Sequence, residues 1–89
     1  MPLKSVIARV GGTEIKVVNT WFHGAKLFVN GQEVAVNNKY FSLSKSHPVM
    51  SVRTLVDGTE RLIEVFAFAV LTVKLKICLD GKQIAGDQF

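Results

Sequence analysis

The chain has 89 residues, of which 48% are apolar, and its 11 Lys and Arg residues outnumber its 7 Asp and Glu residues, giving a formal net charge of +4. A chain this short has room for one compact core, so we expect a single domain over residues 1–89. The single cysteine, Cys78, excludes an intramolecular disulfide, and no paired Cys and His spacing predicts a metal site. The N-terminal residues do not resemble a secretory signal and no apolar run is long enough to span a membrane, so we expect a cytoplasmic location.

Apolar and polar residues alternate along most of the chain, and this period of two predicts β-strands separated by tight hairpin turns. In the first half, strands are expected near residues 4–10, 13–19, 25–30 and 32–36, with turns at Gly11-Gly12 and Asn30-Gly31. In the second half, strands are expected near residues 49–56, 59–68, 72–79 and 82–86, with turns at Asp57-Gly58 and Asp80-Gly81. Residues 40–43 are a candidate for a short ninth strand. No segment shows the period of an amphipathic helix.

An internal repeat organises these strands. Residues 26–35 (KLFVNGQEVA) match residues 76–85 (KICLDGKQIA) at a constant offset of 50 positions, and residues 10–14 match residues 56–60 at an offset of 46. Four residues have therefore entered a strand or the middle connection of the second copy. The repeats span residues 5–41 and 51–89, and each reads as two hairpins with one apolar face. Two such units can bury each other's face, which predicts an all-β fold: an antiparallel β-sandwich or flattened barrel of about eight strands from two four-strand repeats.

The residues that could carry catalysis are few. His23 lies in the connection between the two hairpins of the first copy and His47 lies in the linker between the copies, and neither has a second ligand at a metal-binding spacing. Most carboxylates stand in or beside turns, where turn geometry explains them. Gly11-Gly12 opens a strand, so it does not form a phosphate-binding loop. The sequence therefore predicts no catalytic residue, no cofactor and no metal, and the chain is not expected to be an enzyme.

The basic charge raises the alternative of a nucleic-acid-binding β-barrel, since such barrels combine positive charge with exposed aromatic rings. The Lys and Arg residues are instead spread along the chain at turns and outward strand positions. Outward lysines commonly keep sheet edges from pairing with other chains. A solvated basic surface is therefore favoured, and nucleic-acid binding remains the alternative function.

Apolar residues outside the expected core point to contact with another protein. Trp21 and Phe22 form an aromatic pair in a connection, and the repeat does not explain them. Phe28 and Cys78 occupy matching positions in the two copies and face away from the apolar rows beside them, so Cys78 is interpreted as packing rather than as a reactive thiol. Trp21, Phe22, Phe28 and Cys78 are the candidate interaction surface. The expected partner is a protein, in the first place a second copy of this chain.

The order of strands and turns over residues 6–18 with 24–34, and again over 52–65 with 73–84, resembles the β-sandwich repeat of the Fas apoptosis inhibitory molecule family. The resemblance implies a soluble, non-enzymatic β-sandwich that acts by binding other proteins, and it transfers no functional residue to a position in this chain. The expected function is accordingly that of a non-catalytic protein-interaction or structural module that self-associates.

Overall fold

The computed structural model describes residues 3–20, 24–37, 48–69 and 73–88. Within these ranges every regular element is a β-strand: β1 (Leu3–Val10), β2 (Thr13–Thr20), β3 (Gly24–Val29), β4 (Gln32–Asn37), β5 (Met50–Val56), β6 (Thr59–Ala69), β7 (Val73–Leu79) and β8 (Lys82–Gly86). None of the described residues belongs to a helix of the length and apolarity that crossing a membrane requires. The candidate ninth strand at 40–43 lies outside the described residues.

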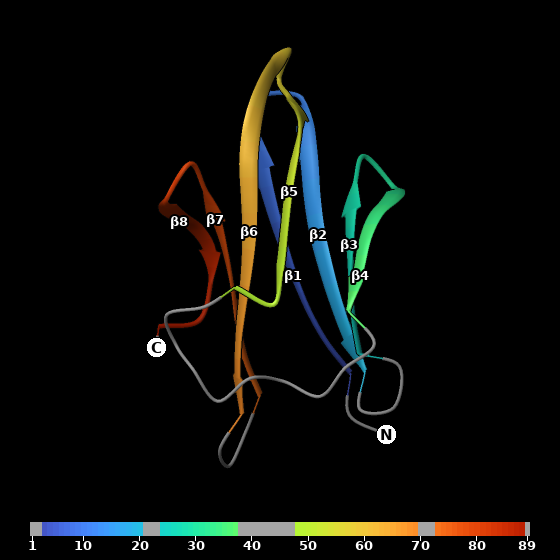
Figure 1. The fold of residues 1–89 in the computed structure, drawn as a ribbon, viewed down its shortest axis with the longest axis vertical. Helices are drawn as coiled ribbons and strands as arrows, with labels where there is room; N and C mark the ends of the chain where they lie inside the picture. The colour runs from blue at the N-terminus through green and yellow to red at the C-terminus, as the bar shows by residue number, and fades with distance from the viewer. Residues whose placement is uncertain (1–2, 21–23, 38–47, 70–72, 89) are drawn as a thin grey trace.

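The strands form two antiparallel sheets in which every strand pairs with its neighbour in sequence. The first sheet has the order β1-β2-β3-β4 and the second the order β5-β6-β7-β8. The sheets stack on each other, with β5 and β6 passing in front of β1 and β2 in Figure 1. At the edges of the stack, β1 lies next to β7 and β8, and β4 lies next to β5. The predicted all-β sandwich of two four-strand units is therefore confirmed.

Turn chemistry places the hairpins where the sequence predicts them. Asn30, Asp57 and Asp80 adopt left-handed backbone angles of φ 52°, 53° and 50°, and the glycine after each also has positive φ, as a type I′ turn requires. The turn between β1 and β2 differs, because only its first residue, Gly11, has positive φ. That pattern is typical of a type II′ turn, so this hairpin uses the other of the two favoured geometries.

Alternate side chains of the central strands face the space between the sheets and form the core. The largest fully buried side chains are Ile15, Val17, Leu27, Val56, Ile63, Val65, Leu75 and Ile77. Complete burial of one such side chain stabilises the fold by about 1.5–3 kcal/mol. Partly buried apolar side chains extend the core to the edge strands. They are Val6 and Val10 on β1, Val34 and Ala35 on β4, Val49 just before β5, Val52 on β5, and Ile84 and Ala85 on β8.

The two sheets have the same pattern of strand pairing, and both have a β-bulge between their last two strands. The register shifts between Leu27 and Phe28 where β3 meets β4, and between Ile77 and Cys78 where β7 meets β8. Each bulge leaves one extra residue on the edge strand, Val34 in β4 or Ile84 in β8. The two sheets are thus built on one plan, with the last two strands offset by 50 positions.

The second sheet has extra residues in its first two hairpins, and in the β5–β6 hairpin both strands are longer, because Met50 and Val56 are six positions apart whereas their counterparts Val6 and Val10 are four apart. Ile15 pairs with Val29 and Ile63 pairs with Leu79, so these rungs are equivalent, although Ile63 lies two positions further from its turn than Ile15 does. Two extra residues therefore lengthen the start of β6. The other two extra residues, Ala69 and Val73, form one additional residue pair at the end of the β6–β7 hairpin.

This insertion changes one match made from the sequence. The Asn30 side chain accepts a hydrogen bond from the backbone N–H of Glu14 at 2.8 Å, and the Asp80 side chain accepts one from the N–H of Leu62 at 3.0 Å. Leu62 therefore takes the place of Glu14 in the ladder. Glu60 matches Glu14 only in its distance from the turn.

Candidate interaction surfaces and contacts between the sheets

Large apolar side chains on the outside of the sandwich are concentrated on edge strands. Ile7 on β1 is 52% exposed, Val36 on β4 is 44% exposed and Leu55 on β5 is 66% exposed. All three side chains point away from the core, because successive side chains of a strand face opposite sides of the sheet and their neighbours in sequence face the core. Sequence reasoning expected surplus apolar groups outside the core but did not name these residues. The outward parity of Ile7 and Leu55 was readable from the alternation with Ser5, Arg9 and Arg53. Simple alternation would have placed Val36 on the inward face, and the bulge at Val34 turns it outward.

Phe28 lies on the outward face of the first sheet, as predicted, and is half-buried. Its neighbours across the sheet are Lys16 on β2 and Glu33 on β4. The half-buried Val18 lies two residue pairs away, on the same face of β2. The Phe28 ring therefore has apolar surface to offer, although charged side chains flank it.

Cys78 occupies the matching position of the second sheet but is only 7% exposed. Its neighbours across the sheet are Glu64 and Gln83. Burial raises the pKa of the Cys78 thiol, an effect that the positive charge of Lys76 opposes and the negative charge of Glu64 reinforces. A buried thiol with a raised pKa is a poor nucleophile and contributes little contact area. The other two candidate residues, Trp21 and Phe22, lie outside the described residues, as do His23 and His47.

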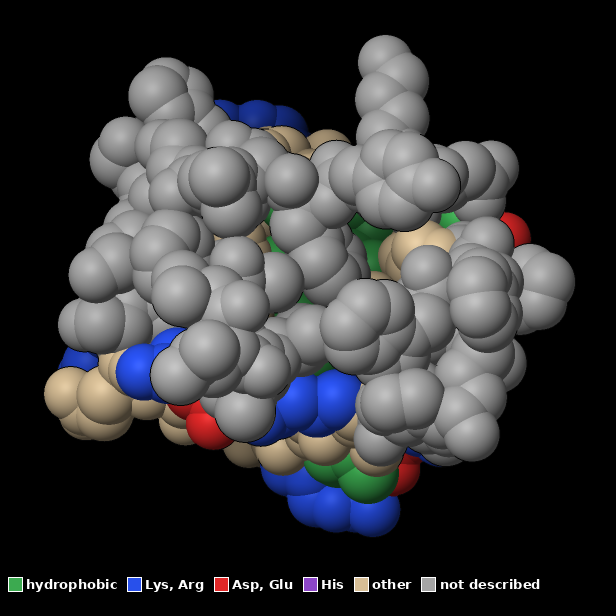
Figure 2. Space-filling model, turned by 90° about the horizontal axis from the view of Figure 1, so that it is seen from below, with side chains coloured by type: hydrophobic (Ala, Val, Ile, Leu, Met, Phe, Trp, Pro, Cys, Tyr) green, Lys and Arg blue, Asp and Glu red, His purple; other side chains and the backbone are tan. Residues whose placement is uncertain are grey.

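The outward face of the second sheet carries a cation above an aromatic ring. The Lys76 ammonium lies 5.0 Å from the centre of the Phe66 ring, and the two residues are opposite each other on β7 and β6. The exposed Lys74 stands on the same face of β7. Elsewhere basic side chains are dispersed: seen from below, the described Lys and Arg side chains appear at several separate places (Figure 2).

The turn between β1 and β2 and the turn between β5 and β6 contact each other at the top of the molecule in Figure 1. The backbone N–H of Asp57 donates to the hydroxyl of Thr13 at 2.8 Å, and the N–H of Gly12 donates to the Asp57 carboxylate at 3.4 Å. A side chain at Gly11 would overlap that carboxylate. Asp57 therefore shapes its own turn and also contacts the equivalent turn of the other sheet.

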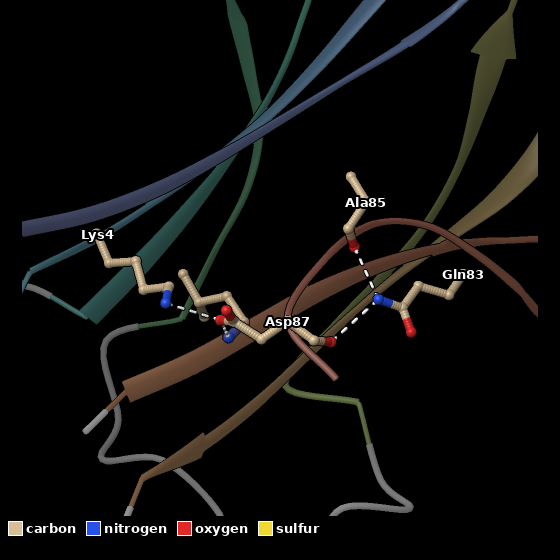
Figure 3. A network of polar contacts seen from close by, with 5 residues as sticks. Lys4, Gln83, Ala85 and Asp87 are labelled. Carbon is tan, nitrogen blue, oxygen red and sulfur yellow. Dashed lines mark hydrogen bonds and ion pairs between the residues drawn. The ribbon is translucent and has the colours of Figure 1, made fainter. Parts of the chain in front are cut away.

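A second polar contact joins the sheets near the chain ends (Figure 3). The Lys4 ammonium on β1 lies 2.8 Å from the Asp87 carboxylate, which also accepts a hydrogen bond from the backbone N–H of Leu75 at 2.9 Å. The Gln83 side chain donates to the Asp87 carbonyl oxygen at 3.0 Å. The bond from Lys4 and that from Leu75 hold the pKa of the Asp87 carboxyl below its usual range. By contrast, the pairs Arg9–Glu14, Lys26–Glu33 and Arg61–Asp80 each lie within one sheet.

Next to this contact, the core contains a polar side chain. Asn19 on β2 is 3% exposed, and its side-chain oxygen has no hydrogen-bond partner. Its neighbours across the sheet are Lys4 and Ala25. At the equivalent rung of the second sheet the residue is Ala67, which pairs with Leu75. The two sheets therefore differ in polarity at this position of the core.

The two sides of the sandwich are not equivalent. We call the edge formed by β1 and β8 the β1–β8 side, and the edge formed by β4 and β5 the β4–β5 side. Val6 and Met50 pair with the equivalent residues Val17 and Val65, so the counterpart of Lys4 is Pro48, two positions before Met50. The counterpart of Asp87 is Asn37. Among the described residues, the ion pair that joins the sheets on the β1–β8 side has no equivalent on the β4–β5 side.

Comparison with known proteins places the chain in no group: no family model, no curated protein and no solved structure matches it. Among the described residues, no three His, Cys, Asp or Glu side chains are close enough together to hold a metal ion. The described surface offers exposed aliphatic groups, the half-buried rings of Phe28 and Phe66 on the two outward faces, and dispersed charge.

Proposed function

We propose that this chain is a non-catalytic cytoplasmic module that works by protein contact and that it associates with a second copy of itself. One observation carries the proposal: Ile7, Val36 and Leu55, which lie outside the core, are 52%, 44% and 66% exposed. Isolated apolar side chains on a surface are common, but here half-buried apolar residues of the same edge strands adjoin them. A protein partner would remove both groups from water.

Size favours this interpretation. A domain of 89 residues buries only about 60–65% of the surface that its unfolded chain exposes, so its stability margin is thin. Association is a common way for a small domain to bury more apolar surface. A two-fold contact is the commonest arrangement among soluble homo-oligomers. The resemblance to the Fas apoptosis inhibitory molecule family would imply the same class of function.

Sedimentation equilibrium at micromolar concentration tests the proposal. We expect a species of twice the chain mass of 9.8 kDa, which dissociates on dilution. A monomer at every accessible concentration would contradict self-association. The exposed aliphatic side chains would then have to be assigned to a different protein.

Nucleic-acid binding is the second candidate, and the Lys76–Phe66 pair with Lys74 beside it favours it. A ring next to lysines can stack on a base while the ammonium groups contact phosphates. The test is a titration with single-stranded oligonucleotides at several salt concentrations, because affinity for phosphates falls steeply with salt. Submicromolar binding at physiological salt that Phe66→Ala weakens would favour this candidate over the first.

A further inference from the structure

We propose that Lys4, Asn19 and Asp87 form a binding site for a small uncharged ligand that carries an amide group. We call these three residues the polar cluster. Lys4 belongs to β1, Asn19 belongs to β2, and Asp87 directly follows β8, so both sheets contribute to the site. The ligand site is separate from the proposed protein contact and does not depend on it.

The Asn19 side chain is the observation that points to a ligand. Asn19 is 3% exposed, and no described residue donates a hydrogen bond to its side-chain oxygen. Buried oxygen atoms in native proteins almost always accept a hydrogen bond, and each exception requires an explanation. A bound ligand with an N–H group would supply the donor that the described part of the chain does not.

The second sheet shows that the fold itself does not need a polar group at this place. Ala67, at the position equivalent to Asn19, is fully buried and has no polar side-chain atom. Pro48 and Asn37 correspond to Lys4 and Asp87, and neither carries a charge. The chain therefore places its polar cluster at one of two equivalent positions, at the cost of a buried oxygen without a donor. Departures of this kind from the rules of core packing are typical of functional sites.

The polar cluster extends from the surface into the core. The side chains of Lys4 and Asp87 are 36% and 33% exposed, whereas Asn19 is buried. The apolar neighbours of the cluster, Ala25 beside Asn19 and Leu75 beside Asp87, are also buried. Ligand sites commonly have this composition, in which a few polar groups are surrounded by apolar side chains.

Charge identifies the class of ligand. Lys4 and Asp87 lie 2.8 Å apart and point toward each other in Figure 3, so their charges cancel. The Asp87 oxygen that Lys4 contacts also accepts the Leu75 backbone N–H at 2.9 Å. An anionic ligand would compete with Asp87 for the ammonium, and a cationic ligand would compete with Lys4 for the carboxylate. An uncharged ligand leaves both existing contacts in place.

The hydrogen-bonding groups of Lys4 and Asn19 match those of an amide. The two residues are direct neighbours across β1 and β2, and the Cβ atoms of such neighbours are about 4.5–5.5 Å apart on one face of the sheet. Asn19 offers an oxygen that requires a donor. Lys4 has three N–H groups, of which the contact with Asp87 needs one. An amide presents an N–H and a C=O side by side, so one amide group can donate to Asn19 and accept from Lys4.

The experiment is a nuclear magnetic resonance titration of the isotope-labelled full chain with acetamide. We expect saturable shifts of the Asn19 side-chain amide signals, with a dissociation constant in the millimolar range because acetamide has few atoms. Acetate has the same shape but is an anion without an N–H group, so it should bind about tenfold more weakly or less. Absence of a saturable shift, or acetate binding as tight as that of acetamide, would overturn the proposal.

Variants test whether the polar cluster is the site. Asn19→Ala and Lys4→Met should each weaken acetamide binding about threefold to tenfold, because each removes one hydrogen bond to the ligand. Lys26→Met is the matched control, since Lys26 also pairs with an acid, Glu33, but within one sheet and on an exposed position. It should leave the dissociation constant within about twofold. Circular dichroism checks that the strands of each variant still form.

The outcomes separate the ligand site from the proposed function. Acetamide binding that neither Asn19→Ala nor Lys4→Met weakens would show that the polar cluster is not the site. A monomeric chain that binds acetamide at the polar cluster would contradict self-association and support the ligand site. A dimeric chain that does not bind acetamide would do the reverse.

Discussion

The first sheet, β1 to β4, and the second sheet, β5 to β8, share strand order, register and bulge, yet they differ at the positions where they touch each other. Buried Thr13 and exposed Thr59 are equivalent residues of their turns, and Asn19 corresponds to Ala67. On the last strands, Val36 and Asn37 correspond to Gly86 and Asp87. Apart from Thr13 and Asn19, the buried side chains described in the two units are apolar. What distinguishes them is the polar and glycine residues that join one sheet to the other, and each pair can be tested with its counterpart as control.

The largest effect is expected at Gly86. Its φ of +106° is unfavourable for any side chain, and a Cβ there would overlap the Leu75 carbonyl oxygen and lie 2.6 Å from Lys76 Cα. Gly86→Val should therefore lower the free energy of unfolding by about 3 kcal/mol, measured by urea denaturation. The reverse change at the equivalent position, Val36→Gly, should cost about 1 kcal/mol or less. If Gly86→Val and Val36→Gly lowered the free energy of unfolding by similar amounts, the close approach of Gly86 to β7 would not be what distinguishes β8 from β4.

The next effect is expected at the joined hairpin tips. Thr13 is 5% exposed and accepts the hydrogen bond from Asp57 N–H, so Thr13→Val should leave that donor without its partner and cost about 1–2 kcal/mol in thermal or urea unfolding. Thr59→Val changes the exposed equivalent and should stay within about 0.5 kcal/mol of wild type. Equal costs would show that the tips do not stabilise each other.

Asn19 should give a smaller effect of opposite sign. Its side-chain oxygen is buried without a hydrogen-bond partner, which costs free energy in the folded state. Asn19→Ala installs the residue that the second sheet already has as Ala67, and we expect stability to rise by about 1 kcal/mol. A loss of stability in the same unfolding assay would indicate that the amide is paired in solution.

The smallest effect concerns Asp87 and depends on pH. Because the pKa of Asp87 is lower in the folded chain than in the unfolded chain, its contribution is present above the unfolded value, near pH 4, and is lost as pH falls through the folded value. Asp87→Asn should cost about 0.5 kcal/mol at pH 7, since the pair with Lys4 is partly exposed, and should reduce the loss of stability in acid. Lys4→Met should behave similarly at pH 7, and stability curves identical to wild type would show that the pair does not hold the β1–β8 side together.

Much of the strand plan could be predicted because it depends on local chemistry. The Asn-Gly and Asp-Gly dipeptides mark the turns after β3, β5 and β7, and the alternation between turns identifies the buried rows. The repeat was also visible, but matching its turn residues placed Glu60 rather than Leu62 at the position of Glu14. The insertion could not be located because a two-residue extension preserves the alternation of a strand.

The candidate site was less predictable. Phe28 was correctly placed on an outward face, but Cys78 is nearly buried there, which depends on the side chains from neighbouring strands rather than on parity. The contacts between Thr13 and Asp57 and between Lys4 and Asp87 depend on how the sheets stack, and a single sequence carries no signal for that geometry. Which edge strands remain exposed follows from the same stacking, so the degree of exposure of Val36 and Leu55 emerges only from the structure.

The neighbour-to-neighbour order of both sheets bears on how the chain folds. Every strand pair in the described residues joins consecutive strands, so each ladder can grow by closing short loops, with individual hairpins forming in about 1–10 microseconds. Only the stacking of one sheet on the other brings together residues as distant as Gly12 and Asp57, 45 positions apart. Contacts of long sequence separation slow folding because they must overcome more chain entropy. We therefore expect the contacts between the sheets to form later than the contacts within each hairpin.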